Sequence, residues 1–183
     1  MSDPTAEDAC RVASTALSEP ALSARRFTTG LHHFVYEVEL PEHRTVVMRM
    51  TRASERPFMR SAVMLSEQLR PLGVPLPRLL AADTEAPLPW MLLERLPGVD
   101  LWEVVGGLQD ANLKVIAGHV AAAQAIAATM PTAGRYGFSA MPEDAPFTGW
   151  SELVAADVER SRGRIVNAGL FVRRMSSVSN AFG

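Results

Sequence analysis

Alternating apolar and polar positions over residues 45–50 predict a β-strand in the amino-terminal half of the chain. Val46, Met48 and Met50 fall on one face of this strand, because successive side chains point to opposite sides. Arg49 falls on the other face. A cation in an otherwise apolar strand is costly unless its charge meets a partner, so Arg49 is a candidate ligand contact.

A second strand over residues 34–40 precedes this one, and the polar turn at 41–44 joins them into a hairpin. A glycine turn at 28–31 comes before the hairpin. Together, a glycine turn, a hairpin and one inward cation suit the cover of a phosphate chain. The competing interpretation is an ordinary hairpin with a surface arginine, which these residues alone favour.

The rest of the first hundred residues also shows helix and strand periodicity. The run at 90–93 is continuously apolar, as expected of a central strand buried on both faces. It leads into residues 94–98, a polar and then rigid exit. The other predicted elements are helices over 6–17 and 58–69 and strands over 23–29 and 78–82. The pattern predicts a mostly antiparallel, five-stranded sheet with helices.

The second half of the chain is predicted to be helical, with helices over 101–108, 110–130 and 150–164. The helix over 110–130 is rich in alanine and apolar residues, so we expect it to be buried in a second, helical packing unit. Few other predicted elements are available to pack against its apolar surface, and exposed apolar patches favour association with another molecule. We therefore expect self-association through the helical part.

Composition excludes several classes of protein. The formal net charge of −2 provides no basic field for nucleic acid and no polybasic membrane signal. No apolar run is long enough for a membrane span. Cys10 is the only cysteine, so there is no disulfide framework and a reducing cytoplasm is the expected location.

Metal and nucleophile chemistry find little support in the sequence. His32 and His33 are adjacent and would point opposite ways in a strand, while His43 and His119 are distant from them. No Gly-x-Ser-x-Gly motif occurs, and Cys10 has no activating context. We expect no metal site among these residues and assign no catalytic residue.

The order of elements resembles the front half of the aminoglycoside phosphotransferase family, small-molecule kinases with a protein-kinase-like fold. The residues that carry the resemblance span about 25–150. The run at 73–77, followed by an apolar strand and Leu-Pro-Gly at 96–98, is a fairly specific combination. The matching stretches are TTGLHHFVYEVEL, TVVMRM, LRPLGVPLPRLLAAD, WMLLERLPGVDL and RYGF.

The resemblance implies an α+β fold, with a kinase-like nucleotide-binding lobe over residues 1–97 and a truncated helical lobe over 98–183. It also implies ATP-dependent phosphorylation of a hydroxyl group on a small molecule such as an aminoglycoside. Magnesium would be bound only if the rest of the second lobe were supplied. The expected partners are thus a nucleotide and a hydroxyl acceptor, with no nucleic acid and no membrane.

The resemblance also assigns roles to residues of the first lobe. Arg49 stands where such kinases place the cation on the α- and β-phosphates, and Val47 on the same face would lie against the adenine. Thr29 and Gly30 belong to the phosphate-covering loop, residues 28–33.

The hinge between the lobes would follow the apolar strand at 90–93. The carbonyl of Glu94 and the N–H of Leu96 would bind the adenine edge. Asp100 is a weaker candidate for a ribose or substrate contact.

The chain also departs from the family pattern. The glutamate that should pair with Arg49 is not evident, and Glu55 and Glu67 are the two candidates. The catalytic loop, His-x-Asp followed by Asn, and the later metal-binding Asp do not occur in the 183 residues. We expect the chain to be catalytically incomplete. The alternative is a non-catalytic nucleotide-binding or interaction fragment.

Overall fold

The computed structural model of the protein describes residues 3–28, 33–131 and 133–168. The chain divides into two compact units, Met1–Pro131 and Thr132–Gly183. The lobe boundary predicted after residue 97 is a different division, based on the family resemblance, and it stays a prediction.

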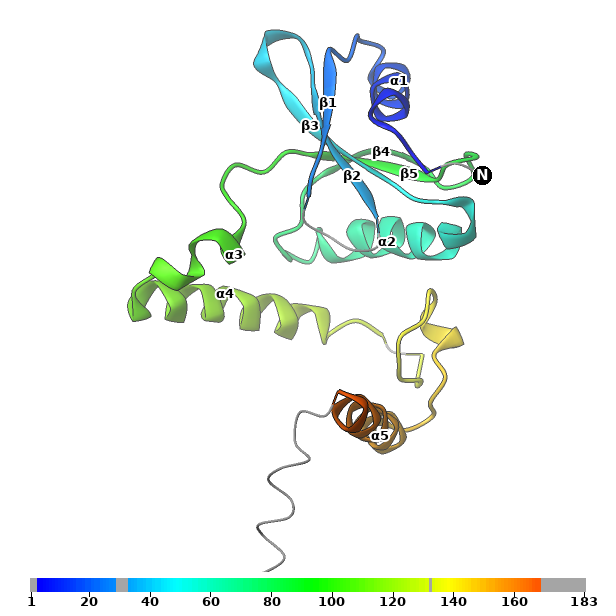
Figure 1. Ribbon diagram of the computed structural model, residues 1–183, viewed down its shortest axis with the longest axis vertical. Helices are drawn as coiled ribbons and strands as arrows, with labels where there is room; N and C mark the ends of the chain where they lie inside the picture. The colour runs from blue at the N-terminus through cyan, green and yellow to red at the C-terminus, as the bar shows by residue number, and fades with distance from the viewer. Residues whose placement is uncertain (1–2, 29–32, 132, 169–183) are drawn as a thin grey trace, which may run out of the picture. The chain divides into compact units, whose positions relative to one another are not determined.

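The first unit is built on one antiparallel sheet of five strands, which confirms the predicted α+β class and five-stranded sheet (Figure 1). The strand order is β1-β2-β3-β5-β4, so the cation-bearing β3 is central. The predicted and observed strand bounds differ by at most one residue, except that β1, predicted to reach residue 29, ends at Arg26. The helices predicted over 101–108 and 110–130 also end earlier, at Val104 and Ala127. The strands are β1 Ser23–Arg26, β2 Phe34–Glu39, β3 Thr45–Met50, β4 Leu79–Asp83 and β5 Trp90–Glu94.

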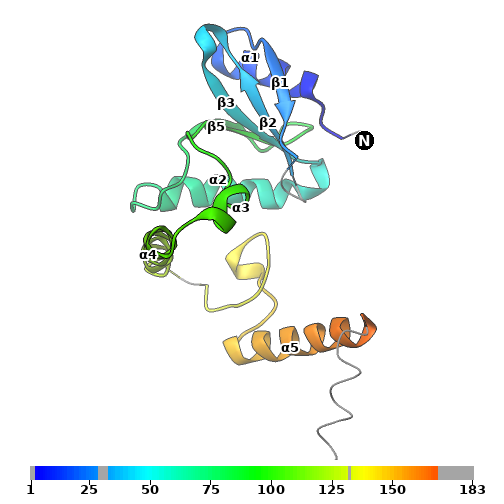
Figure 2. The ribbon, with the colours of Figure 1, turned by 60° about the vertical axis from the view of Figure 1, so that its left-hand side comes forward.

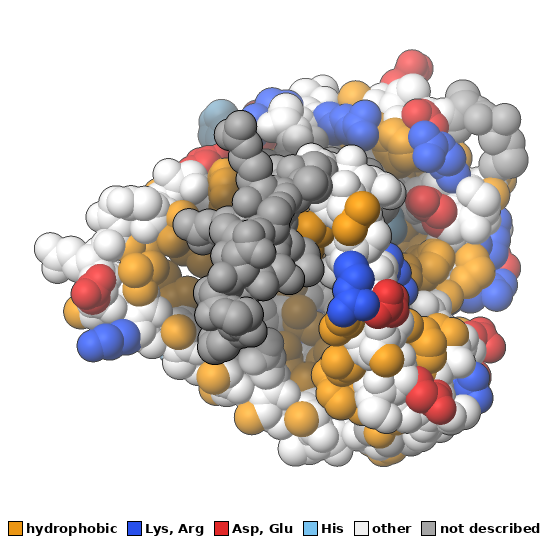
Figure 3. Space-filling view, turned by 60° about the horizontal axis from the view of Figure 1, so that its bottom comes forward, with side chains coloured by type: hydrophobic (Ala, Val, Ile, Leu, Met, Phe, Trp, Pro, Cys, Tyr) orange, Lys and Arg blue, Asp and Glu red, His pale blue; other side chains and the backbone are white. Residues whose placement is uncertain are grey.

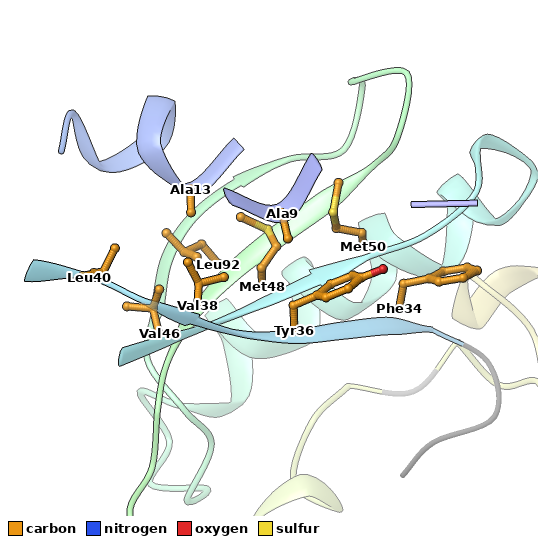
Figure 4. Close-up of a cluster of buried hydrophobic side chains, with 10 residues drawn as sticks. All are labelled: Ala9, Ala13, Phe34, Tyr36, Val38, Leu40, Val46, Met48, Met50 and Leu92. Carbon is orange, nitrogen blue, oxygen red and sulfur yellow. The ribbon is translucent and has the colours of Figure 1, made fainter. Parts of the chain in front are cut away.

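Helix α1 (Ala6–Leu17) covers one face of the sheet and encloses the main core. The Thr5 hydroxyl accepts the N–H of Asp8, whose carboxylate in turn accepts the N–H of Thr5, so the helix begins with a capping box. Small residues at Ala9 and Ala13, one turn apart, let the helix approach the strands closely. The buried side chains are Ala9, Ala13, Phe34, Tyr36, Val38, Leu40, Val46, Met48, Met50 and Leu92 (Figure 4).

Tyr36 provides a measure of how firmly the amino-terminal segment is held. Its side chain is buried, and its hydroxyl donates to the carbonyl of Pro4 at 2.6 Å. Tyr36→Phe removes the donor and leaves that carbonyl without this bond, so we expect a loss of about 1 kcal/mol in unfolding free energy. Urea denaturation measures the loss. Tyr136→Phe, at an exposed tyrosine, is the control, and equal stability of Tyr36→Phe and the parent would contradict the role of this bond.

Helix α2 (Arg56–Leu69) lies on the opposite side of the sheet from α1 (Figures 1 and 2). Met59 is its fully buried anchor. The guanidinium of Arg56 donates to the carbonyls of Thr84 and Ala86, the latter at 2.9 Å, so it ties the start of the helix to the β4–β5 turn. These contacts fix α2 through the backbone of a neighbouring turn.

The helical remainder of the first unit comprises α3 (Leu101–Val104), a short 3₁₀ turn and α4 (Asp110–Ala127). The expected burial of the helix over 110–130 is wrong: no residue of α4 is buried, and Val115 and Val120 are 59% and 52% exposed. Alanine makes this segment a good helix former, but its small side chains do not require a packed environment. The expected self-association stays a prediction.

The second unit contains α5 (Trp150–Asn167). Its exposed side chains include Trp150, Val158 and Val166, and Figure 3 shows hydrophobic side chains at the surface of the face that carries α5. Among the helices of the described residues, none is long and apolar enough to cross a membrane.

Candidate functional site

Val47 and Arg49 lie on the opposite face of the sheet from Met48, as the alternation in β3 predicts. Met48 belongs to the core that α1 covers. The strand register places Arg49 directly across from Val35 on β2 and from Met91 on β5. Cross-strand partners share a face of the sheet, so the guanidinium stem leaves the backbone between two apolar neighbours. The cation is therefore set in a largely apolar surface.

The charge of Arg49 is not neutralised within the described part of the chain. Its Nε is buried without a hydrogen-bond partner, and no ion pair of the described residues involves this side chain. Burial also lowers the pKa of Arg49, because desolvation disfavours the charged form. A partly buried, unpaired guanidinium is costly for the fold, and an anionic ligand would satisfy it.

Neither glutamate considered from the sequence pairs with Arg49. The carboxylate of Glu55 accepts the hydroxyl of Thr51 at 2.5 Å. Glu67 is exposed on the outer side of α2, whose inward residues include Met59 and Ser66. Neither glutamate thus supplies the carboxylate partner that the family resemblance implies for Arg49.

A pocket of about 480 Å³ opens beside the segment that follows β5. Leu96 and Asp100, both predicted from the resemblance, line it. Asp100 also caps α3, where its carboxylate accepts the N–H of Trp102 at 2.9 Å. The full lining is Arg25, Arg26, Phe27, Thr28, Arg95, Leu96, Pro97, Gly98, Val99, Asp100 and Glu103.

Among the described residues, the predicted Val47 and Arg49 do not line this pocket. Val47 and Arg49 lie further along the sheet, and Thr29 and Gly30 lie outside the described residues. The carboxylate of Glu94 accepts the backbone N–H of Arg78 at 2.6 Å, so this side chain is hydrogen-bonded to the residue just before β4. That placement is compatible with the prediction for Glu94, which concerned only its backbone carbonyl.

A network of ion pairs at the same pocket was not predicted from the sequence. Glu37 accepts Nη2 of Arg25 at 2.7 Å and Nε of Arg95 at 2.9 Å. A second nitrogen of Arg95 donates to the carbonyl of Leu96, and its guanidinium lies 5.7 Å from the ring centre of Phe27. The sequence did contain two signals. The alternation places Glu37 on the same strand face as Val35, and a charged residue, Arg95, comes shortly after the apolar run at 90–93.

Acid should weaken the fold through Glu37. Its pKa lies below the ordinary 4.5 because first Arg95 and then Arg25 hydrogen-bond to its charged form. A carboxyl with a lower pKa in the folded chain stabilises the fold above its ordinary pKa. That contribution is lost as the pH falls through the folded pKa.

The unfolding free energy should therefore fall as the pH drops below 4.5, and it should fall less steeply in Glu37→Gln. Urea titrations across the acid range measure both slopes. Because other carboxylates, such as Asp8 and Glu85, also have lowered pKa values, only the difference between the two proteins reports on Glu37. Parallel slopes would contradict this prediction.

No group of three or more His, Cys, Asp or Glu side chains in residues 3–28, 33–131 and 133–168 could hold a metal ion. We therefore assign none of these residues to magnesium.

Comparison with known proteins identifies the family of the chain. The family model described as "Phosphotransferase enzyme family" matches residues 23–178, most of the chain, and confirms the resemblance seen in the sequence. No curated protein and no solved structure matches the chain significantly.

Proposed function

The chain belongs to the phosphotransferase enzyme family, and on that premise we propose that it binds ATP on the sheet face that carries Arg49. The observation that carries the proposal is the buried Nε of Arg49, which has no hydrogen-bond partner within the described residues. A guanidinium presents its donors in a planar fork that matches two phosphate oxygens. The triphosphate thus supplies the charge that the fold does not.

The remaining contacts of the proposed nucleotide lie along β3 and at the end of β5. Val47 shares the face of Arg49 two residues earlier in β3 and provides an apolar surface for the adenine. The backbone of Glu94 and Leu96 provides the polar edge for the base, beside the pocket of about 480 Å³. The resemblance assigns Thr29 and Gly30, which lie outside the described residues, to the loop over the phosphates. In this arrangement the nucleotide extends from the segment after β5 toward Arg49.

The reaction class that this site supports is transfer of a phosphoryl group to a hydroxyl of a small molecule. Arg49 would hold the nucleotide phosphates and balance charge as it develops on them. The 183 residues contain no His-x-Asp motif followed by Asn, so we infer that they bind ATP without turnover by themselves. Magnesium, which such kinases generally use, would neutralise phosphate charge when bound.

Calorimetric titration of the purified chain with ATP, with and without magnesium, tests the proposal. Saturable binding at one site supports a nucleotide lobe. Absence of binding to a folded sample would contradict it and favour an interaction module. Release of phosphate, or its transfer to an added aminoglycoside, would contradict the inference of binding without turnover.

A further inference from the structure

A network of three charged side chains joins β1, β2 and the segment after β5 at the rim of the pocket. We call Arg25, Glu37 and Arg95 the hinge clasp. We propose that Arg95 is a positioning residue, an inference that rests on the proposed nucleotide site. Through the clasp it fixes the backbone at Leu96 so that the Leu96 N–H is held ready for the base.

The first step is the geometry of Arg95. Its Nε donates to Glu37 at 2.9 Å, and its Nη1 donates to the carbonyl of Leu96. The guanidinium is planar, so two bonds made from different nitrogens fix both its position and its orientation. The side chains of Arg95 and Glu37 are only 32% and 20% exposed, so this pair is better shielded from solvent than an ordinary surface ion pair.

The second step is the effect on Leu96. Its carbonyl is held by Arg95, and the residue that follows is Pro97. A residue before proline is restricted to extended conformations by the proline ring. The backbone at Leu96 is thus constrained by a side-chain bond and by a covalent neighbour. These constraints limit the directions in which its N–H can point.

The third step links the clasp to the other wall of the pocket. The guanidinium of Arg95 lies over the ring of Phe27, whose N–H donates to the carbonyl of Val35 at 2.9 Å. Phe27 lines the pocket and directly precedes the stretch assigned to the phosphate-covering loop. Arg95 therefore contacts two residues of the pocket lining that come from different parts of the chain, Phe27 and Leu96.

The test compares three variants of the full chain. Arg95→Ala removes both bonds and the ring contact. Arg95→Lys keeps a charge near Glu37 but lacks the fork that reaches the Leu96 carbonyl as well. Arg11→Gln is the matched control, since it breaks an arginine–carboxylate pair of the same length, 2.9 Å to Asp8, on a helix outside the pocket lining.

Two readouts separate positioning from general stability. The first is the NMR order parameter of the Leu96 N–H without nucleotide, and the second is calorimetric affinity for adenosine and, separately, inorganic triphosphate. In Arg95→Ala we expect the order parameter at Leu96 to fall from about 0.85 to below about 0.6 and adenosine binding to weaken about tenfold, with triphosphate binding unchanged. Arg95→Lys should show the same fall in the order parameter, while Arg11→Gln should match the parent.

The outcomes distinguish this inference from the proposed function. If the parent binds neither adenosine nor triphosphate, the proposed function fails, and the base-positioning role fails with it. If the parent binds both and Arg95→Ala binds adenosine as tightly, the proposed function stands and the clasp inference is overturned. An unchanged order parameter at Leu96 in Arg95→Ala overturns the clasp inference as well, whichever ligand binds.

Discussion

Replacing Arg49 with methionine will abolish measurable ATP binding and leave the fold at least as stable as the parent. The guanidinium is the charged group proposed for the phosphates, and charge-assisted bonds of this kind contribute about 2–3 kcal/mol each, or roughly 100-fold in affinity. Methionine has similar length and is apolar, so it fills the space between Val35 and Met91 without the cost of a buried, unsatisfied Nε. We expect stability to rise by about 1 kcal/mol.

Calorimetric titration and urea denaturation of the same samples measure both effects. Arg52→Met is the matched control, since Arg52 is 49% exposed and pairs with Asp3 at 2.6 Å. It should bind ATP like the parent. A clear loss of stability in Arg49→Met would show that the charge of Arg49 already meets a partner in the protein, and unchanged affinity would remove Arg49 from the site.

Leu92→Ala will destabilise the first unit more than any other change considered. Leu92 is fully buried in central β5, directly across from Met48, in the core beneath α1. Truncation to alanine removes buried apolar surface and leaves a cavity. Because β5 is hydrogen-bonded to β3 on one side and β4 on the other, the backbone cannot easily move to close that cavity. Substitutions of this type cost about 2–5 kcal/mol.

The loss is measured as the shift in the urea midpoint at constant slope. Leu22→Ala, at a leucine that is 60% exposed, should cost less than about 0.5 kcal/mol. If the two variants lost similar amounts, Leu92 would not lie in a packed core. A changed slope would mean that the mutation altered compactness as well as stability.

Local alternation was enough to predict much of the fold. The pattern in β3 placed Val46, Met48 and Met50 on one face, and the structure buries all three. It did not reveal that α1 is the element covering them, because that contact depends on Ala9 and Ala13, whose small size carries no periodic signal. Alanine also misled in α4, where helix-forming tendency was interpreted as burial.

The site was predictable only where one strand defines it. Arg49 follows from the alternation of β3 alone. The pairing of Arg95 with Glu37 joins residues 58 positions apart, and it depends on the register of β2 against β3 and of β3 against β5. Local periodicity carries no information on such a register, so the hinge clasp became visible only in the folded chain.

The attachment of Arg56 to the β4–β5 turn has a consequence for the coupling between ligand binding and the position of α2. In a kinase lobe whose helix is held by an ion pair to the phosphate-binding cation, ligand and helix position are thermodynamically linked. Here α2 is anchored to the carbonyls of Thr84 and Ala86, and Arg49 makes no ion pair with it among the described residues. The coupling free energy between ligand and helix should be near zero. The lobe would then act as a preassembled receptor, insensitive to regulators that work by swinging this helix.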